Sequence, residues 1–260
     1  KVISGPPCEL LEWDTAFFGF RTGRVIRNRI MASEVPAILE WCDAQKLSCL
    51  YFLCSPDQDE SVRLAEANGF HLVDVRMEYL WVPSPREKEV LPDPARGSAR
   101  PVVPGDVPWI EKIAADSYTS TRFYFDDRFP REKASALYTE WARKSCSGWA
   151  EAVLVVPRED RVGGFVTRPV DSRERGRIGL VGVDRDCRGA GVGSRVGRAA
   201  QGDFLGRDVS AVTVVTQGRN IEAQRLYQKC GFLPRAIYYW YHKWFSAPGE
   251  TTDGTISNPV

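Results

Sequence analysis

The chain has 260 residues, of which 43% are hydrophobic and 27% are charged, as is typical of a globular protein. Its 35 basic and 34 acidic side chains give a net charge of +1. This balance argues against a broad positive field that would attract nucleic acid or an anionic membrane. The seven cysteines form no CxxC pair and only two histidines accompany them, so we expect reduced thiols and no metal site.

The first residues, KVISGPPCELLEWD, lack the basic head and long apolar run of a signal peptide. No stretch of the sequence reaches the roughly 20 apolar residues of a membrane-spanning helix. We therefore expect a cytoplasmic protein that binds neither membrane nor nucleic acid.

Alternating strands and helices are predicted in the first 82 residues. Strands are expected at 23–30, 47–55 and 70–81, with helical segments at 35–45 and 60–68. This alternation predicts a small α/β domain over residues 1–82.

A segment rich in proline and charge follows, PSPREKEVLPDPARGSARP, with almost no apolar pattern. It predicts a linker over 83–100. The polar, aperiodic stretch from Ser246 predicts a disordered tail over 246–260.

The remaining residues, 101–245, predict a second and larger domain. Helices are expected at 106–119 and 130–144, strands at 150–157, 161–169 and 177–183, a helix from Gly191, a strand at 210–216, a helix at 220–230 and a last strand at 235–244. We expect a mixed sheet flanked by helices, in the α/β (α+β) class.

A glycine-rich loop joins the expected strand at 177–183 to the helix that follows it. Gly189, Gly191 and Gly193 would let the backbone approach a ligand closely, and the free N–H groups of a helix start suit a pyrophosphate. Arg188 adds a positive charge. A ligand-free strand-to-helix turn would use the same glycines, and the spacing fits neither a Walker loop nor a dinucleotide fingerprint.

A second motif follows the next strand: Asn220, Ala223, Leu226, Tyr227, Gly231 and Phe232 in the pattern N-x-x-A-x-x-L-Y-x-x-x-G-F. Asn220 can cap the helix, Gly231 can end it, and Tyr227 lies on the face turned to the sheet. From the residues alone, Tyr227 could equally be a buried core tyrosine.

With Arg188-Gly189-Ala190-Gly191-Val192-Gly193 matching R/Q-x-x-G-x-G/A, the two motifs together resemble the Gcn5-related N-acetyltransferase (GNAT) superfamily. The resemblance implies a GNAT fold with a mixed, mostly antiparallel sheet, and acetyl-CoA as cofactor. It places Tyr227 beside the thioester sulfur as the general acid that protonates the departing thiolate. The cofactor-binding residues that it implies are Val181, Val183, Arg188, Gly189, Ala190, Gly191, Val192, Gly193, Ser194, Asn220 and Ala223.

The segments LEWDTAFFGFRTGRV and ADSYTSTRFYFDDRFPREKASALYTEW extend the resemblance over nearly the whole chain. They are similar to the dTDP-fucosamine acetyltransferase group, which acetylates the 4-amino group of a nucleotide-linked deoxysugar for surface polysaccharide. That group pairs a truncated N-terminal domain with a catalytic domain, and a homodimer is the expected assembly. The aromatic residues of the first segment could equally be a packed cluster without a ligand.

We assign the segment STRFYFDDRF, residues 120–129, to the binding of the sugar nucleotide. Arginines there could meet a diphosphate, rings could stack on a base, and carboxylates could orient the amine. A charged loop pinned by its aromatic residues would look the same. The expected substrate residues are Arg122, Phe123, Tyr124, Asp126, Asp127, Arg128 and Gln217.

The helix ending RLYQKCGF at 225–232 is matched by RLAEANGF at 63–70, which has Ala65 in place of Tyr227. We interpret the first domain as a degenerate half-copy that binds no CoA, although two ordinary glycine-capped helix ends would also share these letters.

The expected reaction is direct attack of a neutral amine on the thioester, with backbone N–H groups near Val181 and Val183 binding the oxyanion. Cys187 and Cys230 have no neighbouring histidine in sequence, so an acyl-cysteine route is not favoured. The strand 177–183 has no carboxylate, so the base is a water chain, Asp126 or Asp127. Two other functions remain open: acetylation of another amine, such as an antibiotic, a polyamine or a protein N-terminus, and non-catalytic CoA binding.

Overall fold

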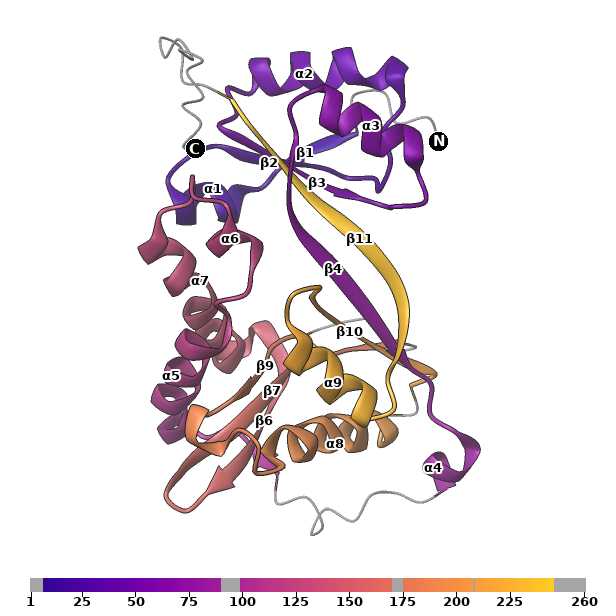
Figure 1. The fold of residues 1–260 in the computed structure, drawn as a ribbon. Coiled ribbons are helices and arrows are strands. Elements are labelled where there is room, and N and C mark those ends of the chain that lie inside the picture. The colour runs from indigo at the N-terminus through magenta and orange to yellow at the C-terminus, as the bar shows by residue number, and fades with distance from the viewer. Residues whose placement is uncertain (1–6, 90–98, 170–174, 208, 246–260) are drawn as a thin grey trace, which may run out of the picture. The chain divides into compact units, whose positions relative to one another are not determined.

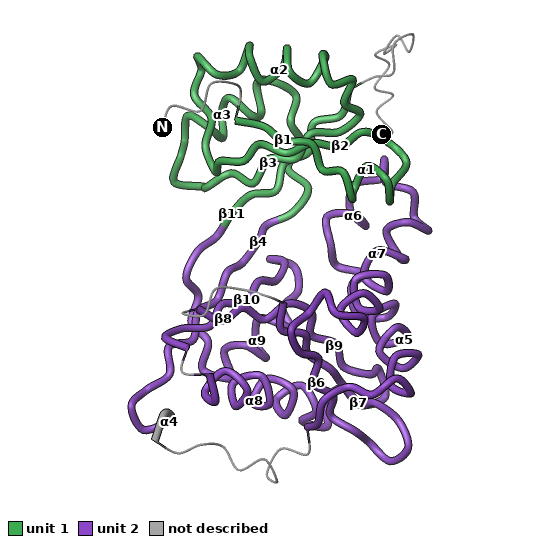
Figure 2. The backbone as a smooth tube through the Cα atoms, turned by 180° about the vertical axis from the view of Figure 1, so that it is seen from behind, with its two compact units in different colours: residues 1–74, 238–260 green, residues 75–237 purple. Residues whose placement is uncertain are grey.

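The computed structural model describes residues 7–89, 99–169, 175–207 and 209–245. The chain forms two compact units, residues 1–74 with 238–260, and residues 75–237 (Figure 2). The boundaries between the units therefore fall inside two long strands. The predicted domains, 1–82 and 101–245, were consecutive stretches of the sequence, and their limits stay a prediction. The predicted tail and most of the predicted linker lie outside the described residues.

The first unit contains a sheet with the strand order β1-β2-β3-β11 and three helices (Figure 1). Strands β2 and β3 are parallel, and the other two pairs are antiparallel. Its elements are β1 (Cys8–Leu10), α1 (Glu12–Phe18), β2 (Thr22–Val25), α2 (Val35–Ala44), β3 (Cys49–Cys54), α3 (Asp59–Ala67), the start of β4 (His71–Trp81) and the end of β11 (Leu233–Trp244).

Two predictions for this unit were incomplete. The strand expected at 23–30 ends at Val25, and helix α1 was not expected. In α1, Trp13 stacks on Phe17 at 4.9 Å between ring centroids, and Phe18 is buried. The aromatic segment is therefore a packed cluster, which was one of its two interpretations.

The second unit contains a four-stranded sheet, β5-β6-β7-β9, and three further strands in the order β4-β10-β8. All pairs are antiparallel except β8 with β10, which confirms the predicted mixed, mostly antiparallel sheet. Its elements are α4 (Pro85–Glu89), β5 (Arg100–Pro101), α5 (Val107–Ser117), α6 (Arg122–Phe125), α7 (Arg131–Lys144), a π-helical turn (Ser145–Trp149), β6 (Ala150–Arg158), β7 (Arg161–Pro169), β8 (Arg175–Arg177), β9 (Val181–Val183), α8 (Val192–Leu205), β10 (Ala211–Gln217) and α9 (Ile221–Lys229). Helix α4 lies where a linker without elements was expected.

The single strand predicted at 177–183 is split in the structure. Residues 175–177 pair with β10, and the Ile178 N–H still donates to the Thr213 carbonyl at 2.9 Å. The Gly179 N–H then donates to Thr167 of β7, and β9 continues along β7. The chain thus changes partner in the middle of an extended stretch, so β9 and β10 separate.

The two similar helix endings form the same set of hydrogen bonds. Phe70 N–H donates to the Ala65 carbonyl at 3.0 Å, and Phe232 N–H donates to the Tyr227 carbonyl at 3.0 Å. The glycine before each phenylalanine has a positive φ, 73° and 82°. The two segments therefore share local geometry as well as letters.

The strands on either side of these helices agree with a duplication too. Cys54 pairs with Tyr239 in the first unit, and Thr216 pairs with Met77 in the second. Adding 162, the spacing of the two helix endings, to 54 gives 216, and subtracting 162 from 239 gives 77. The β3–β11 and β4–β10 ladders therefore correspond residue for residue, with the last strand of each copy paired to the first strand of the other.

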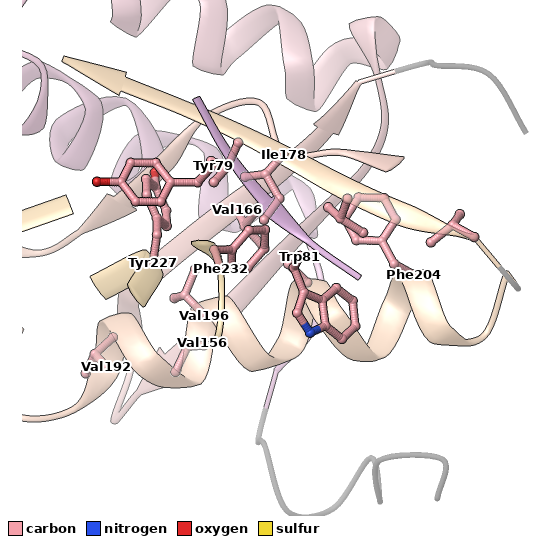
Figure 3. Packing of buried hydrophobic residues seen from close by; sticks show 14 of the residues in the cluster. Tyr79, Trp81, Val156, Val166, Ile178, Val192, Val196, Phe204, Tyr227 and Phe232 are labelled. Carbon is pink, nitrogen blue, oxygen red and sulfur yellow. The ribbon is translucent and has the colours of Figure 1, made fainter. Parts of the chain in front are cut away.

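One core of the second unit lies between α8, α9 and strands of both of its sheets (Figure 3), and another lies between α5, α7 and strands β6 and β7. Helix α8 approaches β7 closely at Gly164: a Cβ there would lie 2.9 Å from Val196 Cγ2 and 3.0 Å from Val192 Cγ1. Glycine at this position is therefore required for the packing of α8.

We expect Gly164→Ala to lower the free energy of unfolding by about 1–3 kcal/mol, because the added methyl group overpacks a buried contact between a strand and a helix. Urea unfolding followed by circular dichroism measures this change. Gly105→Ala is the matched control, since a Cβ at Gly105 would have no atom within 4 Å. Equal stability of the two variants would contradict the close packing of α8 on β7.

Candidate functional site

A cavity of about 1100 Å³ lies in the second unit, with walls from both separated strands, β9 and β10. Ten of the residues predicted to bind the cofactor or to act in catalysis line it. These are Val181, Val183, Arg188, Gly189, Gly191, Gly193, Ser194, Asn220, Ala223 and Tyr227. Ala190 is not among the lining residues, and Val192 is buried in the core under the loop. The two motifs, thirty residues apart in sequence, therefore meet at one cavity.

The glycine loop has the geometry of an anion-binding helix start. Gly189 and Gly191 have φ of 76° and 78°, and Gly191 begins α8 without a side-chain cap. A Cβ at either glycine would meet nothing within 4 Å, so the space in front of the loop is open. Uncapped N–H groups, the dipole of a 14-residue helix and the neighbouring Arg188 fit a pyrophosphate.

Two other glycines bring α8 against α9. A Cβ at Gly193 would lie 3.3 Å from Leu226, and one at Gly197 would lie 2.6 Å from Cys230 Sγ. Gln201 Nε2 donates to the carbonyl of Cys230 at 2.8 Å and so satisfies the end of α9. The loop helix thereby fixes the helix that carries Tyr227, a contact that the sequence analysis missed.

Tyr227 lies on the sheet-facing side of α9 and is 7% exposed. Its ring centroid is 5.9 Å from that of Tyr79 and 6.1 Å from that of Phe232 (Figure 3). Burial raises the pKa of Tyr227 well above its ordinary value, and the neighbouring Cys230 raises it further. The hydroxyl is therefore protonated at neutral pH and is a proton donor at the cavity wall.

The backbone of β9 turns one edge to this cavity. Tyr118, at the end of α5, donates its hydroxyl to the Val181 carbonyl at 2.8 Å and stacks on Tyr138 at 4.4 Å. Asp184 N–H donates to β7, and N–H groups alternate along an extended chain, so those of Val181 and Val183 point away from β7. Burial, and next the proximity of Tyr227, raises the pKa of Tyr118. Tyr118 lies in a segment that carried the family resemblance, but the sequence analysis assigned it no role.

The predicted substrate loop contributes much less to this wall than expected. Among the predicted substrate residues, Gln217 of β10 lines the cavity. The six predicted residues of the loop do not line it: Arg122, Phe123, Tyr124, Asp126, Asp127 and Arg128. Phe123 is buried against Phe129, and Asp126 Oδ1 accepts the N–H of Arg128 at 3.2 Å in a local turn. The loop is thus pinned by its aromatic residues, which was its other interpretation.

The loop meets the cavity in two places: its first residue, Ser120, lines the cavity, and Phe125 contacts a lining residue. The guanidinium of Arg219, which lines the cavity, lies 3.6 Å from the ring centroid of Phe125. The lining residues include six cationic side chains, Arg76, Arg177, Arg188, Arg219, Arg225 and Lys229, against two carboxylates, Asp116 and Glu222. The wall therefore favours anionic ligands.

In the first copy of the repeat, the corresponding place on the helix is filled by the chain itself. Ser61, which corresponds to Ala223, donates to the Ile30 carbonyl at 2.8 Å and accepts the Ile30 N–H at 3.0 Å. Ile30 and Ala65 share one buried core cluster. This packing is a physical reason to expect that the first copy binds no CoA.

The part of the chain that forms the cavity is similar to known acetyltransferases. Residues 112–232 match the model of the acetyltransferase (GNAT) family. A stretch of 150 residues, 58% of the chain, is 28% identical to the spore coat polysaccharide biosynthesis protein SpsD of Bacillus subtilis. The match covers 50% of that relative, so the chain spans about half the length of the curated protein that it resembles.

Solved structures share the fold. A GCN5-related N-acetyltransferase from Sphaerobacter thermophilus matches with a TM-score of 0.61 at 19% identity, over 91% of this chain and 76% of that one. A functionally unknown conserved protein from Staphylococcus epidermidis matches with a TM-score of 0.63 at 17% identity, over 94% and 93% of the two chains. These likenesses confirm the predicted fold class.

None of the helices in the described ranges combines the length and apolar character that crossing a membrane requires.

Asn220 begins α9 as predicted: its Oδ1 accepts the Ala223 N–H at 3.1 Å. We expect Asn220→Ala to lower the free energy of unfolding by about 1 kcal/mol, because a helix-start donor loses its partner. Asn220→Asp keeps an acceptor and should stay within a few tenths of a kcal/mol of the unchanged protein. Urea unfolding of both variants measures the difference; identical losses would show that the cap does not stabilise α9.

Proposed function

We propose, from the match of residues 112–232 to the acetyltransferase (GNAT) family, that the protein is an acyl-CoA-dependent N-acetyltransferase. The observation that carries the proposal is the position of Tyr227, a buried proton donor at a cavity that also holds the glycine loop. The Tyr227 side chain, the glycine loop and the β9 residues Val181 and Val183 all line this one cavity. The arrangement is suited to group transfer.

Acetyl-CoA is the cofactor that GNAT acetyltransferases use, and the loop fits its pyrophosphate. We propose that Arg188, Gly189, Gly191, Gly193 and Ser194 hold the phosphates, with Ala190 and Val192 shaping the loop, and that Asn220 and Ala223 border the pantetheine arm. When bound, the cofactor supplies an activated acetyl thioester.

In the proposed reaction a neutral amine attacks the thioester carbonyl directly. The N–H groups of Val181 and Val183 would stabilise the negative charge on the carbonyl oxygen, and the Tyr227 hydroxyl would give its proton to the departing sulfur. An acyl-cysteine route is disfavoured because Cys187 is buried and burial raises the pKa of Cys230.

The amine must lose a proton during the reaction. Asp126 and Asp127 do not line the cavity, so of the expected bases a water chain is favoured. The proton would leave through the open side of the cavity, without a dedicated carboxylate on β9.

For the acceptor we propose the 4-amino group of a nucleotide-linked deoxysugar, with dTDP as the expected nucleotide. The basic cavity wall suits a diphosphate, and the curated relative is named for polysaccharide biosynthesis. Another primary amine is the alternative acceptor. A cytoplasmic location and a homodimer belong to the same proposal.

Tyr227→Phe should lower kcat by about 10²–10⁴-fold, because the phenyl ring keeps the packing but has no proton to donate. Tyr79→Phe is the matched control and should keep most of the activity: Tyr79 is also buried and adjacent, but its hydroxyl donates to Gln224 Oε1 at 3.1 Å. Turnover is measured as release of free CoA thiol. Full activity of Tyr227→Phe would refute the general-acid role.

A panel of acceptors tests the substrate class. With acetyl-CoA present, dTDP-linked 4-amino sugars should release CoA thiol at least tenfold faster than spermidine, an aminoglycoside or a peptide N-terminus, because only the first carries a diphosphate for the basic wall. A faster rate with one of the latter would support the alternative acceptor. The absence of thiol release with every amine would support a non-catalytic CoA-binding protein.

A further inference from the structure

The cavity has basic residues on a second side, away from the glycine loop. We propose that Arg76 of β4 and Arg177 of β8 bind the phosphate groups of the acceptor, and that aromatic residues of α7 and the following turn hold its base. This inference rests on the proposed function and adds where, and through which residues, an anionic acceptor is held.

The two arginines lie on one face of the same set of strands. Arg177 pairs with Thr213 of β10, and Arg76 pairs with Gln217 of β10, four residues further along. Side chains alternate along a strand, so both positions share a face, opposite to the one that Val212 and Val214 bury in the core. The two arginines are two strand spacings apart across the sheet and four residues apart along it. Their Cα atoms are therefore about 16 Å apart, a separation that lets both side chains line one cavity.

This side of the cavity is distinct from the loop that would hold the cofactor. From Arg177 the chain runs through six residues to Val183, and only then enters the glycine loop. An extended run of that length spans about 20 Å. One anion on the loop and another on Arg177 would therefore flank the exposed edge of β9 and Tyr227.

Aromatic side chains line the cavity beyond the arginines. Tyr138 stacks on Tyr118, Trp141 packs edge-on against Tyr138 at 5.2 Å, and Trp149 is 53% exposed. Lys144 Nζ lies 4.3 Å from the ring centroid of Trp149. Of these rings Trp149 is the exposed one, and an aromatic wall beside cationic side chains suits a planar base joined to phosphates.

The local charge balance agrees with an anionic ligand. Arg76 lies 3.7 Å from Glu78, which is closer to Arg235, at 3.2 Å. The two lining carboxylates lie elsewhere: Asp116 is at the end of α5, where its carbonyl faces Arg188, and Glu222 is in the first turn of α9. Cationic side chains therefore outnumber carboxylates among the residues that line the cavity.

The inference moves the phosphate-binding role from Arg122 and Arg128, which do not line the cavity, to residues that do. It also gives the first copy of the repeat a part in binding. Arg76 lies on β4, the last strand of that copy, and β4 pairs with β10 inside the second unit. The copy without a tyrosine would thus supply an acceptor-side residue to the copy with one.

Isothermal titration of the full chain with dTDP, and separately with acetyl-CoA, tests the site. Arg76→Ala and Arg177→Ala should each raise the Kd for dTDP at least tenfold and change the Kd for acetyl-CoA less than twofold. Arg175→Ala is the matched control, because Arg175 is on the same strand and face as Arg177 but does not line the cavity. Unchanged dTDP affinity in both variants, or equal weakening of acetyl-CoA, would overturn the proposal.

A kinetic comparison separates this proposal from the proposed function. Both variants should raise KM for a dTDP-linked amino sugar about tenfold, with kcat and the rate on the same amino sugar without phosphates unchanged. If the wild-type protein acetylates the free sugar but does not bind dTDP, the phosphate site is wrong and the acetyltransferase assignment stands. If it binds dTDP through Arg76 and Arg177 but releases no CoA thiol with any amine, the site stands and the enzymatic function fails.

Discussion

The separation of β9 from β10 is the constraint on which the site depends. The extended chain at 175–183 pairs first with β10 and then with β7, and the exchange takes place over Ile178 and Gly179. A strand that kept one partner would satisfy its backbone groups in a continuous ladder and leave no cavity. Because the partner changes, one edge of β9 is turned to the cavity, beside both Tyr118 and Tyr227.

The pairing between the two copies of the strand–helix–strand repeat explains why residues of the first copy pack against residues of the second. The ladders β3–β11 and β4–β10 have equivalent registers, and each joins strands of different copies. Tyr79 of the first copy consequently packs against Tyr227 of the second, and its hydroxyl bonds to Gln224 in the same helix. Loss of catalytic residues from the first copy would therefore not release it from selection on packing, since its last strand is part of the core around the site.

Helix ends and the glycines of the loop before α8 were predictable because their causes are local. Gly191 needs a positive φ at a helix start, and Asn220 caps its own helix, so both leave a signature within a few residues. The split of the strand at 177–183 depends on which strands compete for it, and the hydroxyl of Tyr118 bonds to a carbonyl 63 residues away. For the loop at 122–128, composition suggested a ligand, but aromatic residues and aspartates also stabilise local turns, as the Phe123–Phe129 contact and the bond from the Arg128 N–H to Asp126 do here.

The difference between Ala65 and Tyr227 gains its meaning from the residues beside them. In the first copy, Ser61 exchanges two hydrogen bonds with Ile30, so the chain lies against the helix face that borders the cavity in the second copy. Restoring a tyrosine at Ala65 alone would then overpack a buried cluster rather than create an active site, because Ala65 has no exposed surface. At the second helix, Ala223 makes no such bonds through its side chain, and the neighbouring space stays open. The cavity and the tyrosine therefore occur together: the proposed role of Tyr227 requires a helix over which the chain does not close.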